Sequence, residues 1–487
     1  MQASLFRVLF RHEVTSLYRN RVLVTLFSIL LMLLVGALWI GSSLLGQQQQ
    51  TLGRIQAHRV EAQDSLTARI RRIEAHGMRY AGFIWDDPTF AYNTARNEGA
   101  QYAVKQPFAL QALATGQSGV QPFYYKVYIA KKQYLVHESE IDNSFLQFVG
   151  PFDFSFVVVY LLPLLIIVFT YNILSSEKEQ GTWVLLKTSN QSIAWLLLGR
   201  LVIRYGLFTS FFWVVVVPVL ALLIGPAFLA SPNWWWLVAF VSLYFAFWFG
   251  LAFLVNSFSL SSNLNAMSLI FLWLLLGLVL PNLLQIGLGR AYPIPSRIAL
   301  TTAERDATNR YFEQEGQLLT KAVFNSPRAL IRQASIVTPG MVYGYGVIVS
   351  KSQVIKDQAT RVAEDQLYGQ IEKQQAAIRR LQLLSPALLL QEVLAALAGT
   401  HWHQFNEFSR DVDAFRGRTQ QFFYPKMALE GTFRTFTVAD AAAIPQFRPQ
   451  VYADYGWLHL GQALGLYAGV VLGLGLLGYR RLLSASR

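Results

Sequence analysis

The residues best suited to bind another molecule form a short charged stretch between two apolar segments. Glu177, Lys178 and Glu179 follow the apolar segment 154–174, and the next apolar segment is 205–228. Each apolar segment holds the roughly 20 residues that a helix needs to cross a bilayer. Charged side chains cannot rest in hydrocarbon, so these three mark a face in water. A charged turn between two such segments predicts a docking surface rather than a catalytic centre.

A second, short helix is expected after this charged turn. Gly181 breaks the first helix, and Thr182 has the side chain of a helix N-cap. Trp183 and Ile193 then fall near one side of the new helix, opposite polar residues. The stretch 175–199 is therefore expected to be a small amphipathic element pinned between two membrane helices.

Three other patterns look like functional motifs but have simpler structural explanations. His401 and His403 are two residues apart, so they do not share a helix face, and no third metal ligand accompanies them. Asp86 and Asp87 precede a proline, which is typical of a turn. The run 473–478 matches G-x-G-x-x-G, but it follows no strand and lies in an apolar segment.

The sequence predicts no cofactor site and no enzymatic activity in this chain. No G-x-x-x-x-G-K-[ST] motif occurs, so a Walker-type nucleotide site is not expected. The absence of cysteine excludes disulfides, thiolate metal sites and cysteine nucleophiles. No metal site is expected either.

Composition places the chain among membrane proteins. Of its 487 residues, 53% are hydrophobic and 14% are charged, whereas about 25% are charged in soluble domains. The net charge of +13 comes from basic residues spread along the chain. Because they form no basic stripe and no known binding module, a nucleic-acid partner is not expected.

Six apolar segments are long enough to cross the membrane. They are residues 22–46, 154–174, 205–228, 234–255, 266–288 and 457–478. Basic residues gather at the cytoplasmic ends of spans. The basic stretch 1–21 and the basic tail 479–487 therefore place both termini in the cytoplasm. Arg200 and Arg204 flank the third span on the same side.

The stretch 1–21 is expected to be an amphipathic helix on the membrane surface. Its apolar residues fall on one half of a helical wheel, with Arg7 and Arg11 opposite. Glu13 alone interrupts the apolar half. The apolar run that follows is too long for a signal peptide, so we expect an uncleaved first span.

Two long polar insertions, 47–150 and 289–456, follow an odd number of spans and are expected outside the cytoplasm. Both are predicted to be mainly helical, with a strand pair at 124–136, where aromatic and β-branched residues gather. One helix is especially well defined, with Ser385 as its N-cap and Gly399 just past its end. The predicted fold is an α-helical polytopic membrane protein with six transmembrane helices and two mainly helical (α+β) extracytoplasmic domains.

Small residues in the sixth span predict close helix packing. Gly461, Gly465, Gly469 and Gly473 recur at every fourth position. They form a smooth strip on which another helix can pack, either within this chain or across a dimer.

Polar residues at the ends of spans are expected to hydrogen-bond the backbone rather than a substrate. These residues are Asn172, Asn256, Asn263 and Asn265. The spans are otherwise apolar, and neither they nor the insertions show residues that specify a substrate.

The charged stretch also resembles a known family. The sequence E-K-E-Q-G-T-W-V-L-L at 177–186 is similar to the E-x-E-x-G-T segment of type-2 ABC transporter permeases. Further stretches resemble the subgroup of these permeases that has two large extracytoplasmic insertions. These stretches are residues 102–104, 116–118, 124–126, 152–181 and 385–400.

The resemblance implies a role for each part of the charged stretch. In that family this segment forms a coupling helix that sits in a groove of the ATPase subunit. The residues assigned to ATPase coupling are Glu177, Lys178, Glu179, Gly181, Thr182 and Trp183. The stretch 1–21 would be the elbow helix of the family.

The resemblance implies the membrane-spanning permease subunit of an ABC transporter of the exporter class, in a bacterial inner membrane. A separate cytoplasmic ATPase, which holds ATP and Mg²⁺, would drive it through the segment 175–192. A second permease subunit, identical or paralogous, would complete the pathway across the lipid bilayer. Two alternatives stay open: ABC-driven mechanotransmission to a periplasmic partner, and a non-transport membrane receptor or scaffold.

Overall fold

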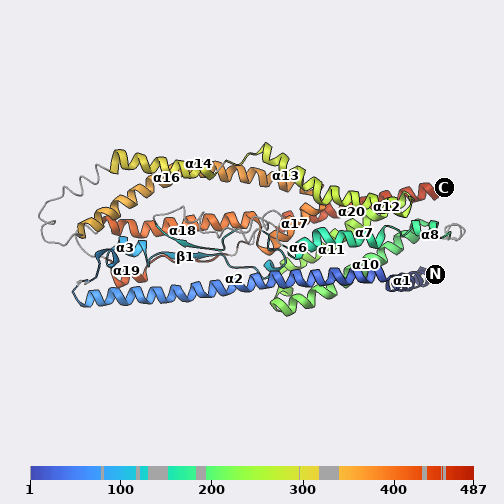
Figure 1. Cartoon of the computed structure of the whole chain (residues 1–487), viewed down its shortest axis with the longest axis horizontal. Coiled ribbons are helices and arrows are strands. Elements are labelled where there is room, and N and C mark those ends of the chain that lie inside the picture. Colours follow the sequence, from blue (N-terminus) through green and yellow to red (C-terminus); the bar gives the residue numbers. More distant parts are fainter. Residues whose placement is uncertain are drawn as a thin grey trace.

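The molecule is a long, mostly helical rod (Figure 1). The computed structural model describes residues 2–77, 80, 82–116, 121–129, 152–181, 193–295, 297–316, 339–429, 436–450, 452 and 457–486. Both chain termini lie at the same end of the rod, together with the short helix α8 (Ser175–Glu179). We call this end the terminal end and the opposite one the distal end.

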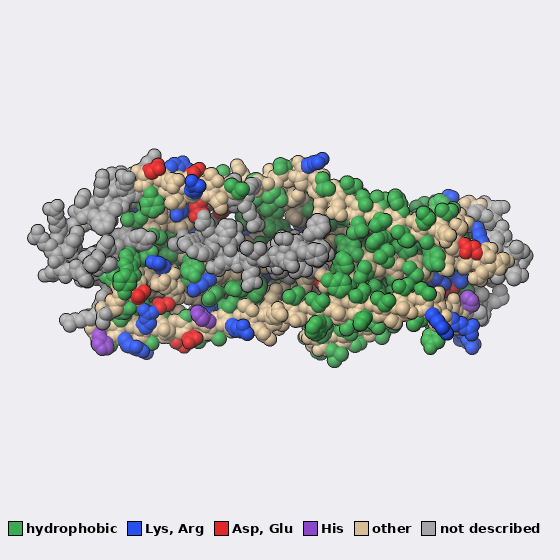
Figure 2. All heavy atoms as spheres, in the orientation of Figure 1, with side chains coloured by type: hydrophobic (Ala, Val, Ile, Leu, Met, Phe, Trp, Pro, Cys, Tyr) green, Lys and Arg blue, Asp and Glu red, His purple; other side chains and the backbone are tan. Residues whose placement is uncertain are grey.

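Six helices within the described residues are long and apolar enough to cross a membrane, which confirms the predicted number. They are Arg21–Ala75, Phe154–Glu179, Ala194–Ile224, Pro232–Ser257, Ser262–Ala291 and His459–Ser484. Hydrophobic side chains cover the terminal half of the rod, and charged ones gather at its end and over the distal half (Figure 2). Many large apolar side chains are exposed on this half, for example Leu222, which is 86% exposed. A large exposed apolar surface is unfavourable in water, so we infer that lipid covers this half. The chain is a multi-pass membrane protein.

Four of the spans are single helices, and two contain a π turn. The single helices are α2 (Arg21–Ala75), α10 (Ile193–Ile224), α11 (Pro232–Ser257) and α20 (Trp457–Ser486). The second span consists of α6 (Phe154–Phe156), the π turn η3 (Val157–Leu161), α7 (Leu162–Thr170) and α8. The fifth consists of α12 (Ser262–Leu274), the π turn η5 (Leu275–Val279) and α13 (Leu280–Ala291).

Two helices extend well beyond the predicted spans. α2 continues for 55 residues, about 80 Å, so the first span and the start of the first insertion form one helix. α10 begins at Ile193, so residues 193–199, which the sequence analysis assigned to the surface element, are its first turns. The reason is that this apolar run meets no proline or other strong breaker before the span. Arg200 and Arg204 therefore lie inside the helix rather than at its flank.

α11 lies at the centre of the membrane half, packed against α7, α10 and α20. Its aromatic side chains Trp234, Tyr244 and Trp248 are at most 2% exposed. The rings of Phe208 and Phe245 meet edge to face with centroids 5.2 Å apart, a contact that contributes about 0.5–1.5 kcal/mol beyond burial. These rigid rings fix the third and fourth spans against each other.

The remaining elements are the N-terminal helix, the link between the third and fourth spans, and the helices and strands of the two insertions. The N-terminal helix is α1 (Gln2–Arg19), and η4 (Pro226–Ala230) joins the third and fourth spans. The first insertion adds η1 (Ile84–Asp86), α3 (Ala91–Arg96), β1 (Gln101–Val104), η2 (Ala109–Ala112) and β2 (Tyr124–Val127). The second adds α14 (Arg297–Arg310), η6 (Tyr311–Gly316), α16 (Pro339–Leu381), η7 (Gln382–Leu384), α17 (Pro386–Ala398), α18 (Trp402–Leu429) and α19 (Val438–Ala442).

The strand pairing differs from the prediction. β2 pairs antiparallel with β1, with Gln101 opposite Val127 and Val104 opposite Tyr124. The partner of the 124–127 strand therefore precedes it in the chain, and residues 130–136 lie outside the described residues. The signal for β1 was weak because its four residues include a glutamine and an alanine.

The two polar insertions share their apolar cores. Leu66 of α2 and Phe90 of the first insertion pack in one cluster with Phe423 of α18. Val127 of β2 packs in a second cluster with Phe408, also of α18. The described parts of the two insertions thus pack as one body, whereas the sequence predicts two domains.

α17 carries the predicted caps but lies in an unexpected place. Ser385 Oγ accepts a hydrogen bond from the Leu388 N–H at 3.2 Å, Pro386 is the first helical residue, and Gly399 follows the last one with a φ of 78°. These observations confirm the predicted helix and both its ends. However, α17 packs against α11 among the membrane spans.

Gly41 of α2 lies too close to η2 to carry a side chain. A Cβ at this position would be 1.9 Å from the carbonyl oxygen of Ala112. We predict that Gly41→Ala lowers the free energy of unfolding by about 1–3 kcal/mol, the usual cost of overpacking, in thermal unfolding in detergent. Gly36→Ala is the control, because a Cβ on Gly36 of the same helix meets nothing within 4 Å. Equal stability of the two variants would contradict the close approach.

Candidate coupling site at the terminal end

α8 continues the second span at the terminal end, and its charged side chains bind neighbouring elements. The Arg200 guanidinium on α10 donates from Nη1 to Glu177 Oε1 at 2.9 Å. Lys178 Nζ donates to the backbone carbonyl of Ser259 at 3.1 Å, in the turn between α11 and α12. Gly181, with a φ of 78°, follows α8, which ends at Glu179 as expected from a helix break at this glycine.

Glu179 binds the start of α12. Its two carboxylate oxygens accept hydrogen bonds of 2.9 Å each from the Ser262 N–H and the Ser262 hydroxyl. A carboxylate at a helix N-terminus is favoured because it satisfies a free N–H and opposes the helix dipole. Ser175, at the start of α8, adds a 2.7 Å bond between its hydroxyl and that of Ser262. The end of the second span is therefore fixed to the beginning of the fifth.

Glu13 of α1 is fully buried between two arginines of α10. Its carboxylate accepts hydrogen bonds from Arg200 Nε at 2.5 Å and from Arg204 Nε at 2.6 Å. The Glu13 side chain is 0% exposed and that of Arg204 is 8% exposed. Since Arg200 also binds Glu177, one guanidinium links α1 to α8.

The same two arginines hold the backbone of the second span. Arg200 donates from Nη1 to the carbonyl of Ile173 at 3.2 Å. Arg204 donates to the carbonyl of Phe169 and lies over its ring, 5.5 Å from the centroid. These carbonyls lie near the break between α7 and α8, where helical partners are missing.

The charges in this network compensate one another. Burial alone would raise the pKa of the Glu13 carboxyl, but the positive charges of Arg204 and Arg200 outweigh burial and hold that pKa below its ordinary value. Glu13 is therefore an anion at neutral pH. With Glu177, it balances the two guanidinium charges.

Two asparagines complete the contacts at the same break. Asn256 donates to the carbonyl of Thr170 at 3.1 Å, and Asn265 donates to the carbonyl of Tyr171 at 3.2 Å. Both side chains are buried. This confirms that these two asparagines hydrogen-bond the backbone at the ends of spans.

The structure brings three predicted coupling residues together and gives them internal partners. The side chains of α8 bind other elements of this chain, namely Glu177 to Arg200, Lys178 to Ser259 and Glu179 to Ser262. These bonds join α8 to the spans. Thr182 and Trp183 lie outside the described residues, as does the whole segment 182–192.

Sequence analysis missed the arginine cluster, although signals for it were present. Glu13 was the single acidic residue on the apolar half of its helix, and a lone carboxylate there needs a buried partner. Arg200 and Arg204 are four residues apart, so they lie on one face of a helix. The pairing itself joins residues almost two hundred positions apart, which no local pattern can reveal.

The glycine strip of α20 is open within the described part of the chain. A Cβ on Gly465, Gly469 or Gly473 would meet nothing within 4 Å. α20 instead approaches α11 through Gly478, where a Cβ would lie 2.7 Å from the Phe253 ring. A Cβ on Gly461, at the start of the strip, would meet the Trp236 ring at 3.8 Å, and both predicted partners for the strip, a helix of this chain and a second subunit, stay predictions.

The other candidate residues have structural roles. Asp87 Oδ1 accepts from the Thr89 N–H at 3.0 Å, which confirms the predicted turn. His401 Nδ1 accepts from the His403 N–H at 3.1 Å, so its Nε2 carries the proton and donates to Glu392 at 2.7 Å. The described residues contain no group of three or more His, Cys, Asp or Glu side chains that could hold a metal.

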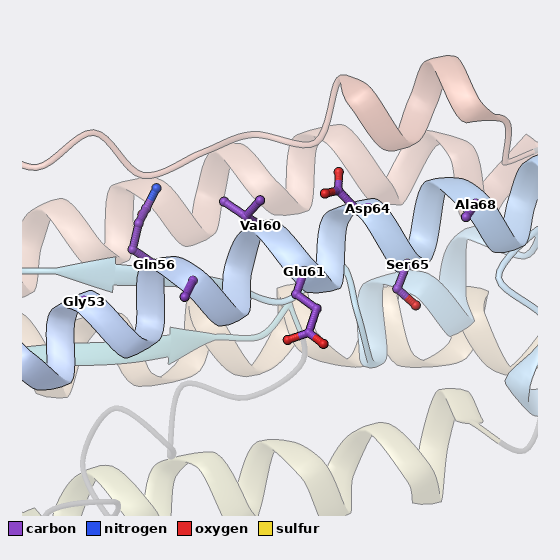
Figure 3. Close-up of a pocket in the computed structure, with 8 residues that line it drawn as sticks. Gly53, Gln56, Val60, Glu61, Asp64, Ser65 and Ala68 are labelled. Carbon is purple, nitrogen blue, oxygen red and sulfur yellow. The ribbon is translucent and has the colours of Figure 1, made fainter.

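A long hollow runs beside α2 in the distal half (Figure 3). The described residues that line it, from Gly53 to Ala68, belong to α2. A wall formed by one helix does not enclose a ligand. We therefore treat it as an exposed helix face, not a substrate site.

Residues 346–450 match a family model described as "Domain of unknown function (DUF3526)". The match covers α17, α18 and α19 and most of α16. No curated protein and no solved structure matches the chain.

Removing the negative charge of Glu13 should destabilise the terminal end. In Glu13→Gln the buried Arg204 guanidinium loses its anion and Arg200 keeps only Glu177, and breaking a buried ion pair costs about 3–5 kcal/mol. We predict a lower unfolding temperature and faster proteolysis between α1 and α2 at pH 7. Because the pKa of Glu13 is lowered, its contribution is complete above the ordinary carboxyl pKa and is lost as pH falls through the lowered value.

The difference between Glu13→Gln and the native chain should therefore shrink only in acid. Glu61→Gln, at an exposed position of α2, is the matched control and should behave as the native chain. A Glu13→Gln protein as stable as the native one at pH 7 would show that the cluster is not a structural requirement.

Proposed function

We propose that this chain is the membrane-spanning permease subunit of an ABC transporter of the exporter class. The observation that supports it best is the position of α8. This helix carries both glutamates of the E-x-E-x-G-T sequence at 177–182, and its charged side chains bind α10, the α11–α12 turn and the start of α12. A separate ATPase would bind the segment from below, as the resemblance implies.

The bonds of α8 suit the transmission of force. A push on α8 reaches the third span through Arg200 and the fifth span through Glu179. It reaches α1 through the carboxylate of Glu13, which Arg200 also binds. Several charge-assisted bonds of this kind make a stiff connection, because each is stronger than a neutral hydrogen bond. No nucleotide site is needed in this chain.

The proposal places the terminal end in the cytoplasm of a bacterium and the distal half outside its inner membrane. Arg7, Arg11, Arg480 and Arg481 are exposed at the terminal end, where the positive-inside rule expects basic residues. The distal half would then form the extracytoplasmic part. A second permease subunit, a copy or a paralogue, would pack on the open glycine strip of α20.

A second candidate function is mechanotransmission to a periplasmic partner. It is favoured by α2, which passes without interruption from the membrane half into the distal half (Figure 1). A helix of 55 residues is a rod of about 80 Å. Such a rod would carry a movement of the spans to the distal half, whether or not a substrate crosses the bilayer.

Reversing the charge of Glu179 should uncouple the ATPase from this chain. In Glu179→Lys a cation replaces the anion at the N-terminus of α12, which is unfavourable there, and both bonds to Ser262 are lost. We predict that the variant inserts normally and still binds the ATPase, but stimulates ATP hydrolysis at least about tenfold less, a factor that the loss of a single charge-assisted hydrogen bond already supplies. Activity of the complex in nanodiscs measures this.

Glu179→Gln is the matched control, because its side-chain oxygen can still accept from Ser262. It should retain most of the stimulation. Native stimulation by Glu179→Lys would count against the coupling role of α8, and failure of any ATPase to bind the native chain would count against the transporter itself.

A further inference from the structure

α17 enters the membrane half from the distal side and does not cross it. Its 13 residues span about 20 Å, less than the roughly 30 Å of a hydrocarbon core. Its N-terminal end lies beside Leu276, near the middle of the fifth span, and its C-terminal end lies beside Asn233 at the start of α11. Ten of its residues are buried.

α17 packs against both π turns of the membrane half, η3 in the second span and η5 in the fifth. A π turn disturbs the regular hydrogen bonding of a helix, and such turns are frequent at functional sites. Side chains from other elements bind the carbonyls of these turns. Tyr244 donates to Val159 at 2.7 Å, and Trp273 donates to the carbonyl of Tyr160 at 3.2 Å.

Ser385 supplies the corresponding bond in the fifth span. Its hydroxyl donates to the carbonyl of Leu276 in η5 at 2.7 Å and accepts from the Leu388 N–H at 3.2 Å. One hydroxyl therefore caps α17 and binds it to the span. Further along α17, Gln391 Oε1 accepts from the Tyr160 hydroxyl of η3 at 3.3 Å.

The spans held by α17 are the same two that α8 holds. α8 is the end of the second span, and Glu179 binds the first residue of the fifth. Polar contacts therefore join the second and fifth spans at two levels. At the terminal ends the contact is direct, and at the π turns it runs through α17. Because both sets of contacts join the same two spans, we expect a change in one set to shift the spans at the other.

The far end of α17 is fixed to the distal half. Lys105, directly after β1, donates to the carbonyl of Gly399 at 2.8 Å. Thr400 donates at 3.0 Å to the carbonyl of Ala114, a residue of the first insertion that packs with the spans. Burial lowers the pKa of Lys105 to about 8. The chain then continues directly into α18, which contributes to both apolar cores of the distal half.

We propose that Ser385 is a positioning residue that holds α17 to the π turn of the fifth span and so makes α17 a connection, beside α2, between α8 and the distal half. The inference rests on the proposed function for the source of the movement. It assigns a mechanical role to the region that matches the DUF3526 model.

The connection can be tested on the chain alone, without an ATPase. Glu179→Lys disturbs the terminal end, and hydrogen exchange of the α18 amides in nanodiscs reports on the distal half. We expect Glu179→Lys to speed α18 exchange about threefold or more. When Ser385→Ala is also present, Glu179→Lys should change α18 exchange less than it does alone, because only the path through α2 remains intact. Ser385→Thr keeps the hydroxyl and should restore the response.

Thr437→Ala is the matched control for the loss of a helix cap. Thr437 caps α19 in the distal half, accepting from the Asp440 N–H at 3.2 Å. This variant should leave the response to Glu179→Lys unchanged. An equal response with and without Ser385→Ala would overturn the proposal, as would an α18 that ignores Glu179→Lys. Neither outcome depends on ATPase binding, so failure here is distinct from failure of the proposed function.

Discussion

The pairing of the buried Glu13 with Arg200 and Arg204 sets the main constraint on the terminal end. Arg200 and Arg204 lie in a helix that is otherwise apolar, and a buried cation is stable only with a bonded anion. Because that anion comes from α1, the N-terminal helix cannot leave α10 without leaving the charge of Arg204 unpaired in an apolar surrounding. Arg200 also binds Glu177, so the requirement extends to α8. The amphipathic helix, the third span and the charged stretch thus form one unit.

The same rule, that buried polar groups need partners, explains the breaks in the membrane helices. The second span is interrupted between α7 and α8, and the freed carbonyls are bound by Asn256, Asn265 and the two arginines. In hydrocarbon no water can replace such partners. Each irregular turn therefore comes with a side chain from another element, and these side chains join the spans to one another. The irregular turns of the membrane helices are thus the positions at which side chains of neighbouring helices bind them.

Sequence reasoning recovered what local patterns encode. Hydropathy gave six spans, and cap residues gave both ends of α17, because each depends on neighbours in the chain. Local patterns could not predict contacts between residues that are far apart in the chain. The partner of β2, the burial of Glu13 and the place of α17 among the spans all depend on how the chain folds back. Residues 193–199 were assigned to the surface element, although they begin the third span. Over only two helical turns, an amphipathic surface helix and the start of a membrane helix have similar sequences.

The claim that α8 receives force from a cytoplasmic ATPase can be tested by labelling a single cysteine. The chain has no cysteine of its own, so Thr182→Cys, next to α8, is the only target for a membrane-impermeant maleimide. The account predicts labelling in inverted vesicles, protection when the ATPase is bound, and no labelling in intact spheroplasts. Glu61→Cys, on the distal part of α2, should show the opposite sidedness. Labelling of Thr182→Cys in intact spheroplasts would contradict the account.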